Sequence, residues 1–318
     1  MQTVWGPLFR PRGRLRVRRE RVATRDGDFV DLDWADGDGR PGAPLLLVLH
    51  GLEGSSRSHY ALSLMRLAQA RRWRAVTLNF RSCSGELNRR PQFYHSGHTD
   101  DLEDVLALVL AREPATRLLV VGISLGGNVL LKWLGERGAG APRGLAGAVA
   151  ISVPYDLGPC ARVLDRGLRR RVYTANFLAS MRAKVRGKAR RSPEFAELVD
   201  LPLALRATTF AEYDRAVTAR LHGFADERDY WVRASSGPYL GGIRRPTLLL
   251  NALDDPIVPP EALPDPGSLP ACVRAEFPRR GGHAGFIEGR WPWRVGSWAE
   301  RRAVEFLAGV LAEPPGIC

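Results

Sequence analysis

The chain contains 318 residues, of which 45% are hydrophobic and 25% are charged. This composition is typical of a globular protein with a substantial core, and it excludes a fibrous or wholly disordered chain. Uncharged apolar runs stay below the roughly 18 residues of a membrane-spanning helix, and the arginine-rich N-terminus lacks the apolar stretch of a secretory signal. No membrane anchor is therefore expected.

The cysteines and the net charge of +13 indicate no cofactor and no specific partner. The cysteines lie far apart, without the spacing of a metal site, at positions Cys83, Cys160, Cys272 and Cys318. We expect reduced thiols, a cytoplasmic location, and neither a metal nor an organic cofactor. The charge also fits nucleic-acid binding. However, arginine far outnumbers lysine in a chain rich in alanine and glycine, so a general compositional bias explains the charge equally well, and no nucleic-acid partner is expected.

The N-terminal part of the chain predicts β-structure. Residues 10–22 alternate basic and apolar residues near their end, which is typical of an edge strand with a solvated face; an arginine-rich arm that contacts phosphate or anionic lipid is the alternative. Residues 21–34 contain an Asp-Gly turn between two alternating segments and predict a β-hairpin. Residues 37–43 are rich in glycine, aspartate and proline and predict a loop.

Two strands and a helix are predicted next. Residues 44–50 form the first fully buried strand, which leads into a loop of small residues, His50-Gly51-Leu52-Glu53-Gly54-Ser55-Ser56. Residues 58–72 predict an amphipathic helix and residues 74–80 the following strand. Cys83, in the loop after that strand, has no obvious base of its own, so we interpret it as structural.

The segment from Tyr94 to Leu102 precedes a predicted helix that ends near residue 111, with Thr99 or Asp100 as its cap. His95 and Asp100 also match the His-x-x-x-x-Asp pattern of glycerolipid acyltransferases, and cap chemistry beside a surface histidine explains them at least as well. His95 and His98 suggest a metal site, but nothing completes the ligand set.

Gly122-Ile123-Ser124-Leu125-Gly126 lies between a predicted strand and a predicted helix. Residues 117–123 are an apolar run typical of a strand buried on both faces, and residues 125–137 carry apolar residues at helical spacing. Gly-x-Ser-x-Gly at such a junction is the nucleophile elbow, in which Gly122 and Gly126 permit a tight turn. The helix N-terminus after Ser124 would face a developing oxyanion.

A helical lid is predicted after the next strand, residues 146–152. From 154 to 242 the chain is mostly helical, and eleven Lys or Arg residues fall between Arg162 and Arg191 with Asp165 as the only acid. This basic face could lie on anionic lipid, hold an anionic substrate, or simply be solvated. Four residues either line an acyl pocket or form the core of the lid itself: Tyr173, Phe177, Leu178 and Met181.

The strand-helix alternation resumes with residues 246–251, followed by Asp254 and Asp255. Residues 271–277 predict the last strand, which precedes a glycine-flanked histidine, His283, and a final helix over 298–312. Asp255 is favoured as the acid that orients His283, and Asp254 as a brace for the loop, although either carboxylate could face the histidine across so short a turn.

Together these residues predict a catalytic triad. Ser124, Asp255 and His283 each follow a strand, in the chain order typical of α/β-hydrolases. His283 would take the proton of Ser124, and Asp255 would hold the imidazole in the required tautomer. The N–H groups of Leu52 and Leu125 would form the oxyanion hole. His50 could be mistaken for the base, but together with Gly51 it fits better as a brace of the oxyanion loop.

The chain resembles the YheT-like family of α/β-hydrolases over nearly its whole length. The stretch from Asp214 to Asp255 carries part of the resemblance, with Trp231 where tyrosine is usual, and Ser82 stands where glycine is usual. The other matching segments are His50 to Ser55, Asn79 to Gly85, Tyr94 to Gly97, Gly122 to Asn128, Asp254-Asp255-Pro256 and Gly281-Gly282-His283.

The resemblance implies a mostly parallel sheet with helices on both faces, a core formed by residues 1–153 and 243–318, and a lid formed by residues 154–242. It also implies hydrolysis of short- or medium-chain acyl esters or monoacylglycerols. Two alternatives remain open: acyl transfer to an alcohol through the same acyl-enzyme, or a catalytically silent fold whose basic lid binds anionic lipid or nucleic acid.

Overall fold

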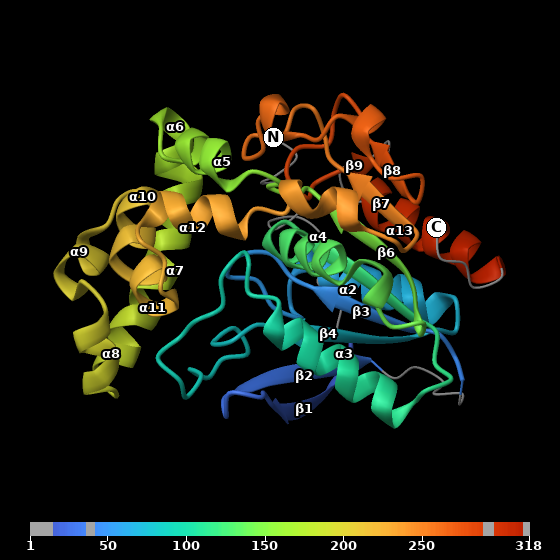
Figure 1. Ribbon diagram of the computed structural model, residues 1–318, viewed down its shortest axis with the longest axis horizontal. Helices are drawn as coiled ribbons and strands as arrows, with labels where there is room; N and C mark the ends of the chain where they lie inside the picture. Colours follow the sequence, from blue (N-terminus) through green and yellow to red (C-terminus); the bar gives the residue numbers. More distant parts are fainter. Residues whose placement is uncertain (1–14, 36–41, 289–295, 314–318) are drawn as a thin grey trace.

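The computed structural model describes residues 15–35, 42–288 and 296–313, and an eight-stranded sheet forms its centre (Figure 1). The strand order is β1-β2-β4-β3-β5-β6-β7-β8. β1 and β2 form the predicted hairpin, β2 pairs antiparallel with β4, and all pairs from β4 to β8 are parallel. The strands are β1 (Arg18–Ala23), β2 (Phe29–Ala35), β3 (Leu45–Leu49), β4 (Arg74–Asn79), β5 (Leu118–Ile123), β6 (Leu145–Ile151), β7 (Thr247–Leu250) and β8 (Val273–Glu276).

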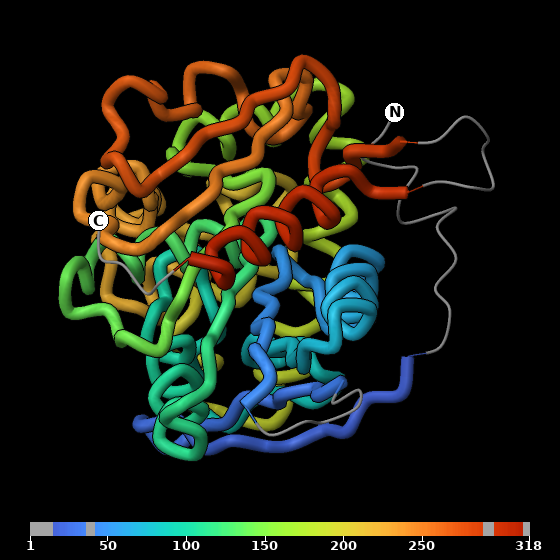
Figure 2. Tube along the Cα trace, turned by 90° about the vertical axis from the view of Figure 1, so that its right-hand side faces the viewer, coloured from blue at the N-terminus to red at the C-terminus, as the bar shows by residue number. Residues whose placement is uncertain are grey.

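Helices cover both faces of this sheet because the parallel strands are apolar on both sides. In β3, Leu45, Leu47 and Leu49 pack in the cluster that contains α3 (Asp100–Arg112) and α4 (Leu125–Arg137). Leu46 and Val48 pack in the cluster on the opposite face, with α2 (His59–Ala70) and α13 (Trp298–Ala312). Figure 2 shows α13 in red running beside the pale blue α2. The predicted three-layer architecture is confirmed.

A helical insert (residues 154–242) leaves the sheet after β6 and returns before β7, and it lies to one side of the sheet (Figure 1). Its own hydrophobic cluster includes Leu178, Phe195 and Tyr213, all buried. Its elements are α5 (Leu157–Leu164), α6 (Gly167–Arg169), η2 (Arg170–Thr174), α7 (Ala175–Ala189), α8 (Pro193–Leu198), α9 (Leu201–Arg206), α10 (Phe210–Tyr213), η3 (Asp214–Thr218), α11 (Ala219–His222), α12 (Glu227–Ala234) and η4 (Gly237–Gly242).

Two asparagines outside the helical insert, one on α4 and one directly after β7, hold its ends. At its start, the Oδ1 atom of Asn251 accepts hydrogen bonds from the N–H of Val153 at 3.1 Å and the hydroxyl of Tyr155 at 3.0 Å. At its end, Asn128 on α4 donates to the carbonyl of Ala234 at 2.7 Å and accepts from the N–H of Ser236 at 2.9 Å. Both ends are thereby fastened to the core.

The remaining elements are short: η1 (Gly138–Gly140), η5 (Pro260–Ala262), η6 (Pro266–Ser268), β9 (Ile287–Glu288) and β10 (Gly296–Ser297). The sequence predicts neither β9 nor β10, because two-residue strands leave no periodic pattern. No helix in the described ranges is long and apolar enough to cross a membrane.

Several details differ from the sequence predictions. Thr99 occupies the cap position of α3, but its side chain makes no cap bond and instead donates to Glu136 at 3.2 Å. The edge strand begins at Arg18, and its Arg19 and Arg21 pair with Asp33 and Asp31 across the hairpin, so these two arginines are engaged within the fold. Residues 10–14, most of the predicted 37–43 loop and Cys318 lie outside the described residues.

Candidate active site

Ser124 stands alone between β5 and α4, in a conformation that few non-glycine residues adopt. Its φ is 53° and its ψ is −118°. A Cβ atom on Gly122 would lie 2.5 Å from the carbonyl oxygen of Gly126, and one on Gly126 would lie 2.5 Å from that of Leu49. The tight approach of backbone to backbone therefore requires both glycines and presents the serine at the tip of the turn.

His283 and Asp255 complete a chain of hydrogen bonds that begins at this serine. The Nε2 atom of His283 lies 2.9 Å from Ser124 Oγ, and its Nδ1 atom lies 2.8 Å from Asp255 Oδ2. The second carboxylate oxygen of Asp255 accepts from the N–H groups of Ile257 at 2.8 Å and Val258 at 3.1 Å. The buried carboxylate is thus fixed in position and directs Nδ1–H toward itself, which leaves Nε2 free to accept the serine proton.

Asp254 faces another partner. Its Oδ1 atom accepts hydrogen bonds from the N–H groups of Gly281 at 2.8 Å and Gly282 at 2.7 Å. These glycines directly precede His283. The structure therefore places Asp255 beside the imidazole and Asp254 beneath the loop that carries it.

Leu52 and Leu125 are the predicted oxyanion donors. Leu125 is the first residue of α4, where an N–H has no partner within the helix. In the described part of the chain, neither of these two N–H groups has a hydrogen-bond acceptor. Gly51 brings the loop of Leu52 close to the elbow, because a Cβ atom on Gly51 would lie 3.2 Å from that of Ser124. Both N–H groups are therefore available beside the serine.

His50 lies fully buried beneath this loop. The N–H of Phe80 donates to its Nε2 atom at 3.1 Å, so Nδ1 carries the proton and donates to the carbonyl of Gly51 at 2.7 Å. Burial lowers the pKa of His50 to about 4. The neutral ring joins the ends of two strands, and both of its nitrogens are occupied.

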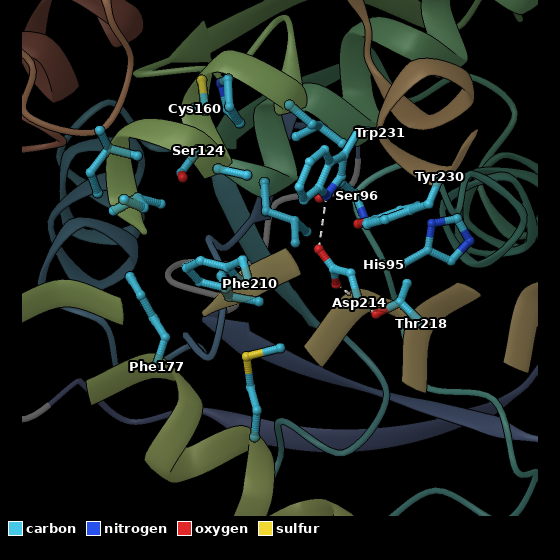
Figure 3. A pocket seen from close by; sticks show the side chains of 18 of the residues that line it. His95, Ser96, Ser124, Cys160, Phe177, Phe210, Asp214, Thr218, Tyr230 and Trp231 are labelled. Atoms are coloured by element: carbon cyan, nitrogen blue, oxygen red, sulfur yellow. Dashed lines mark hydrogen bonds between the residues drawn. The ribbon is translucent and has the colours of Figure 1, made fainter. Parts of the chain in front are cut away.

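An apolar pocket of about 120 Å³ opens beside Ser124 and His283 (Figure 3). Phe177 and Met181 of the helical insert line it, whereas Leu178 is buried in the core of the insert and Tyr173 lines the neighbouring cleft. The sequence had left both roles open for these residues. Other apolar lining residues are Leu157, Leu164, Phe210 and Ile257.

One buried acid interrupts the apolar wall. Asp214 accepts hydrogen bonds from the indole N–H of Trp231 at 2.9 Å and the hydroxyl of Thr218 at 2.8 Å, and Figure 3 shows the group across the pocket from Ser124. Burial raises the pKa of Asp214 to about 7. The pocket thus combines apolar walls with a buried carboxyl group that is held by hydrogen bonds.

The comparisons with known proteins agree with this geometry. Residues 44–290 match the family model described as alpha/beta hydrolase fold. The chain belongs to the α/β-hydrolase family.

Relatives of the chain carry esterase and lipase names. YheT of Escherichia coli, whose esterase name is provisional, is 36% identical over 98% of this chain and 90% of its own length. Phospholipase ABHD3 of Homo sapiens is 30% identical over 98% of this chain and 76% of its own. Pf2001, an esterase of Pyrococcus furiosus, shares the fold with a TM-score of 0.57 and 15% identity over 93% of each chain. The predicted YheT-like membership is confirmed, and these names support a carboxylic ester hydrolase.

Glu53 is the principal site residue that the sequence did not reveal. It follows Leu52 with a φ of 56°, and its N–H donates to the hydroxyl of Tyr94 at 2.8 Å. Its carboxylate accepts from Lys184 Nζ at 2.7 Å and also contacts the hydroxyl of Ser180, both on α7. A glutamate in a small-residue loop gives no signal of this role, because its partners on α7 lie more than a hundred residues away.

The sequence favours solvated side chains for the basic residues of the insert, but Lys184 and Lys188 of α7 bind groups of the core instead. Lys184 Nζ lies 3.3 Å from Cys83 Sγ as well as beside Glu53. Burial lowers the pKa of Lys184, but Cys83 and Glu53 raise it by more. Lys188 donates to the Oδ1 atom of Asn88 at 2.6 Å. Burial raises the pKa of Cys83 to about 11, which agrees with a structural thiol.

Three histidines gather behind the pocket without forming a metal site. His95 lies 5.5 Å from His98 and 4.3 Å from His222, measured between ring centroids. No group of metal-ligating side chains is found among the described residues. Asp100, the predicted partner of His95 in the acyltransferase pattern, instead lies 3.9 Å from Arg25 at the surface. His95 and Asp100 therefore do not form a catalytic pair.

Ser82, where the resembled family has glycine, adopts the left-handed conformation with a φ of 63°. Its hydroxyl donates to the Oδ1 atom of Asn88 at 2.7 Å and accepts from the N–H of the same residue at 3.0 Å. These bonds offset the strain that a side chain introduces there.

Proposed function

We propose that the chain hydrolyses carboxylic esters through an acyl-enzyme on Ser124, with His283 as general base and Asp255 as the acid that orients it. The observation that carries the proposal is the chain of contacts from Ser124 Oγ to His283 at 2.9 Å and from His283 to Asp255 at 2.8 Å. Serine is a weak nucleophile at neutral pH, and this arrangement supplies the base that activates it.

The reaction proceeds in two halves. Ser124 Oγ attacks the ester carbonyl carbon while His283 Nε2 takes the serine proton, and the carbonyl oxygen becomes an oxyanion. The intermediate collapses, His283 protonates the departing alcohol, and the acyl group remains on Ser124. A water molecule then gives a proton to His283 and attacks the acyl carbon, which releases the acid. The N–H groups of Leu52 and Leu125 stabilise both oxyanions; loss of one such donor costs roughly 3 kcal/mol.

The pocket dimensions favour short or medium acyl chains, including those of monoacylglycerols. The apolar pocket measures about 120 Å³, and a wider cleft of about 430 Å³ lies on another side of Ser124. We assign the acyl chain to the first and the alcohol to the second. The helical insert serves as the lid, since its residues line both spaces, and its basic surface allows contact with anionic lipid.

The decisive experiment compares wild type with Ser124→Ala on p-nitrophenyl esters of increasing acyl length. We expect turnover with short or medium chains that falls to background in Ser124→Ala, and labelling of Ser124 by a fluorophosphonate. Ser268→Ala, a serine in the remote segment η6, serves as the control and should retain full activity. Absence of both turnover and labelling in wild type would overturn the proposal. Ester products formed with an added alcohol would indicate acyl transfer instead.

A further inference from the structure

An exposed surface at one end of the helical insert combines apolar and basic side chains. Leu168 on α6 is 73% exposed and Val172 on η2 is 45% exposed, which is unusual for large apolar residues. The arginines around them are also exposed: Arg166, Arg169, Arg170 and Arg171. We call residues 166–172 the insert tip. Figure 1 places α6 at the outer edge of the insert.

The positive charge of the insert tip is not neutralised within the fold. In the described ranges, no carboxylate forms an ion pair with any of its four arginines. The nearest acid in sequence, Asp165, is instead directed at the N–H groups of Phe210 at 2.7 Å and Ala211 at 3.1 Å. Arginines elsewhere in the chain, such as Arg81, have carboxylate partners. The tip therefore presents free cations to solvent.

The insert tip also borders the entrance to the site. Val172 and the next residue, Tyr173, line the 430 Å³ cleft that extends to Ser124 and His283. A surface that held the tip would therefore lie against the cleft through which an ester reaches the serine.

We propose that the insert tip docks on an anionic lipid surface, and the inference rests on the proposed ester hydrolysis. Leu168 and Val172 would enter the headgroup region while the arginines contact lipid phosphates. Two apolar side chains on a protruding tip suit insertion between lipids, whereas a stable protein interface needs a broader surface, on the order of 800 Å² per partner. Docking there delivers a membrane-borne ester to the cleft.

The test is co-sedimentation with vesicles of phosphatidylcholine alone or mixed with phosphatidylglycerol. We expect wild type to bind only the anionic vesicles and to be released by salt. Arg169→Glu/Arg170→Glu should lower the partition coefficient by roughly tenfold or more, and Leu168→Asp, which places a charge on the more exposed of the two apolar side chains, should lower it similarly. The matched control is Arg190→Glu/Arg191→Glu, which makes the same charge change just before α8, at the opposite end of the insert (Figure 1).

Three outcomes of the vesicle experiment would overturn the docking proposal: no vesicle binding by wild type, unchanged binding of the tip variants, or an equal loss in the control. Equal retention on polyglutamate at the same salt would indicate an acidic protein partner instead and also overturn it. Hydrolysis of a dissolved p-nitrophenyl ester, which should be unchanged in the tip variants, reports their folding and separates the two proposals. Vesicle binding without any esterase activity would contradict the proposed function and leave docking supported.

Discussion

At the scale of single residues, Asp254 and Asp255 are adjacent in the chain, yet their carboxylates face different partners. Asp255 lies 2.8 Å from His283 Nδ1, whereas Asp254 accepts from the N–H groups of Gly281 and Gly282. An asparagine at 254 still offers one oxygen to both N–H groups. An asparagine at 255 no longer fixes the tautomer that leaves Nε2 free for the serine proton.

We therefore expect Asp255→Asn to lower kcat by roughly 10⁴-fold with little change in KM, the loss typical of a misoriented triad histidine. Asp254→Asn should lower kcat far less than Asp255→Asn does. Steady-state kinetics on one p-nitrophenyl ester measures both variants. A larger loss in Asp254→Asn would assign the acid role to the other aspartate.

Sequence reasoning selected the serine, the histidine and the pair of aspartates as candidates because each has a local signal: an elbow, a glycine-flanked loop, or a position after a strand. The sequence favoured Asp255 over Asp254 without excluding either, since the direction of a side chain after a strand depends on the turn that follows. The sequence did not predict the role of Glu53, because its lysine and serine partners come from a helix that is distant in the chain.

At the scale of secondary-structure elements, the loop that carries Leu52 and Glu53 is joined to α7 through Glu53. The carboxylate is only slightly exposed and accepts from Lys184, while the Glu53 backbone is held by Tyr94. Removing the lysine would leave a largely buried carboxylate without its counter-charge, which is costly. The loop would shift to bring Glu53 to water, and the neighbouring N–H of Leu52 would shift with it.

We predict that Lys184→Met lowers kcat by roughly 10- to 100-fold with little effect on KM, less than the full loss of an oxyanion donor. Lys184→Arg should restore part of the rate, because it returns the charge. Arg182→Met is the control on the same helix, since Arg182 donates to the carbonyl of Ala207. The idea fails if Lys184→Met retains wild-type kcat, or if Arg182→Met loses as much.

The sequence also did not predict the individual helices of the helical insert. It predicts a mostly helical segment but not its division into helices that are mostly short, because such helices show too few turns for a clear apolar periodicity. The strands and helices of the sheet layer were predicted within a few residues, since buried strands and amphipathic helices have distinct periodicities.

At the scale of the whole molecule, one buried histidine and two partly buried ones make stability sensitive to acid. Burial lowers the pKa of His50 to about 4 and that of His222 to about 3, and it holds the pKa of His95 well below its usual range. His50 directly follows β3 and His95 lies between β4 and α3, whereas His222 belongs to the helical insert. In the unfolded chain each would titrate near pH 6.5.

We expect the free energy of unfolding to fall as the pH drops from about 6.5 toward 4, because only the unfolded chain takes up these protons there. Asp214 acts in the opposite direction, since its raised pKa of about 7 favours the folded state as the pH drops. His222→Gln removes one of these titrating groups. At about pH 5 it should therefore reduce the decrease in the free energy of unfolding by roughly 1 to 2 kcal/mol. Urea unfolding at several pH values measures it; identical pH profiles for the two proteins would contradict the prediction.

The point where the helical insert leaves and rejoins the sheet has a consequence for how such chains diversify. β6 and β7 are neighbours, with Ile151 opposite Leu250, and the asparagines at 128 and 251 hold the two ends of the insert. Strand pairing is therefore complete without the intervening residues. Evolution can therefore lengthen, shorten or replace the helical insert, and so change which substrates reach the pocket, while the sheet and its covering helices stay the same.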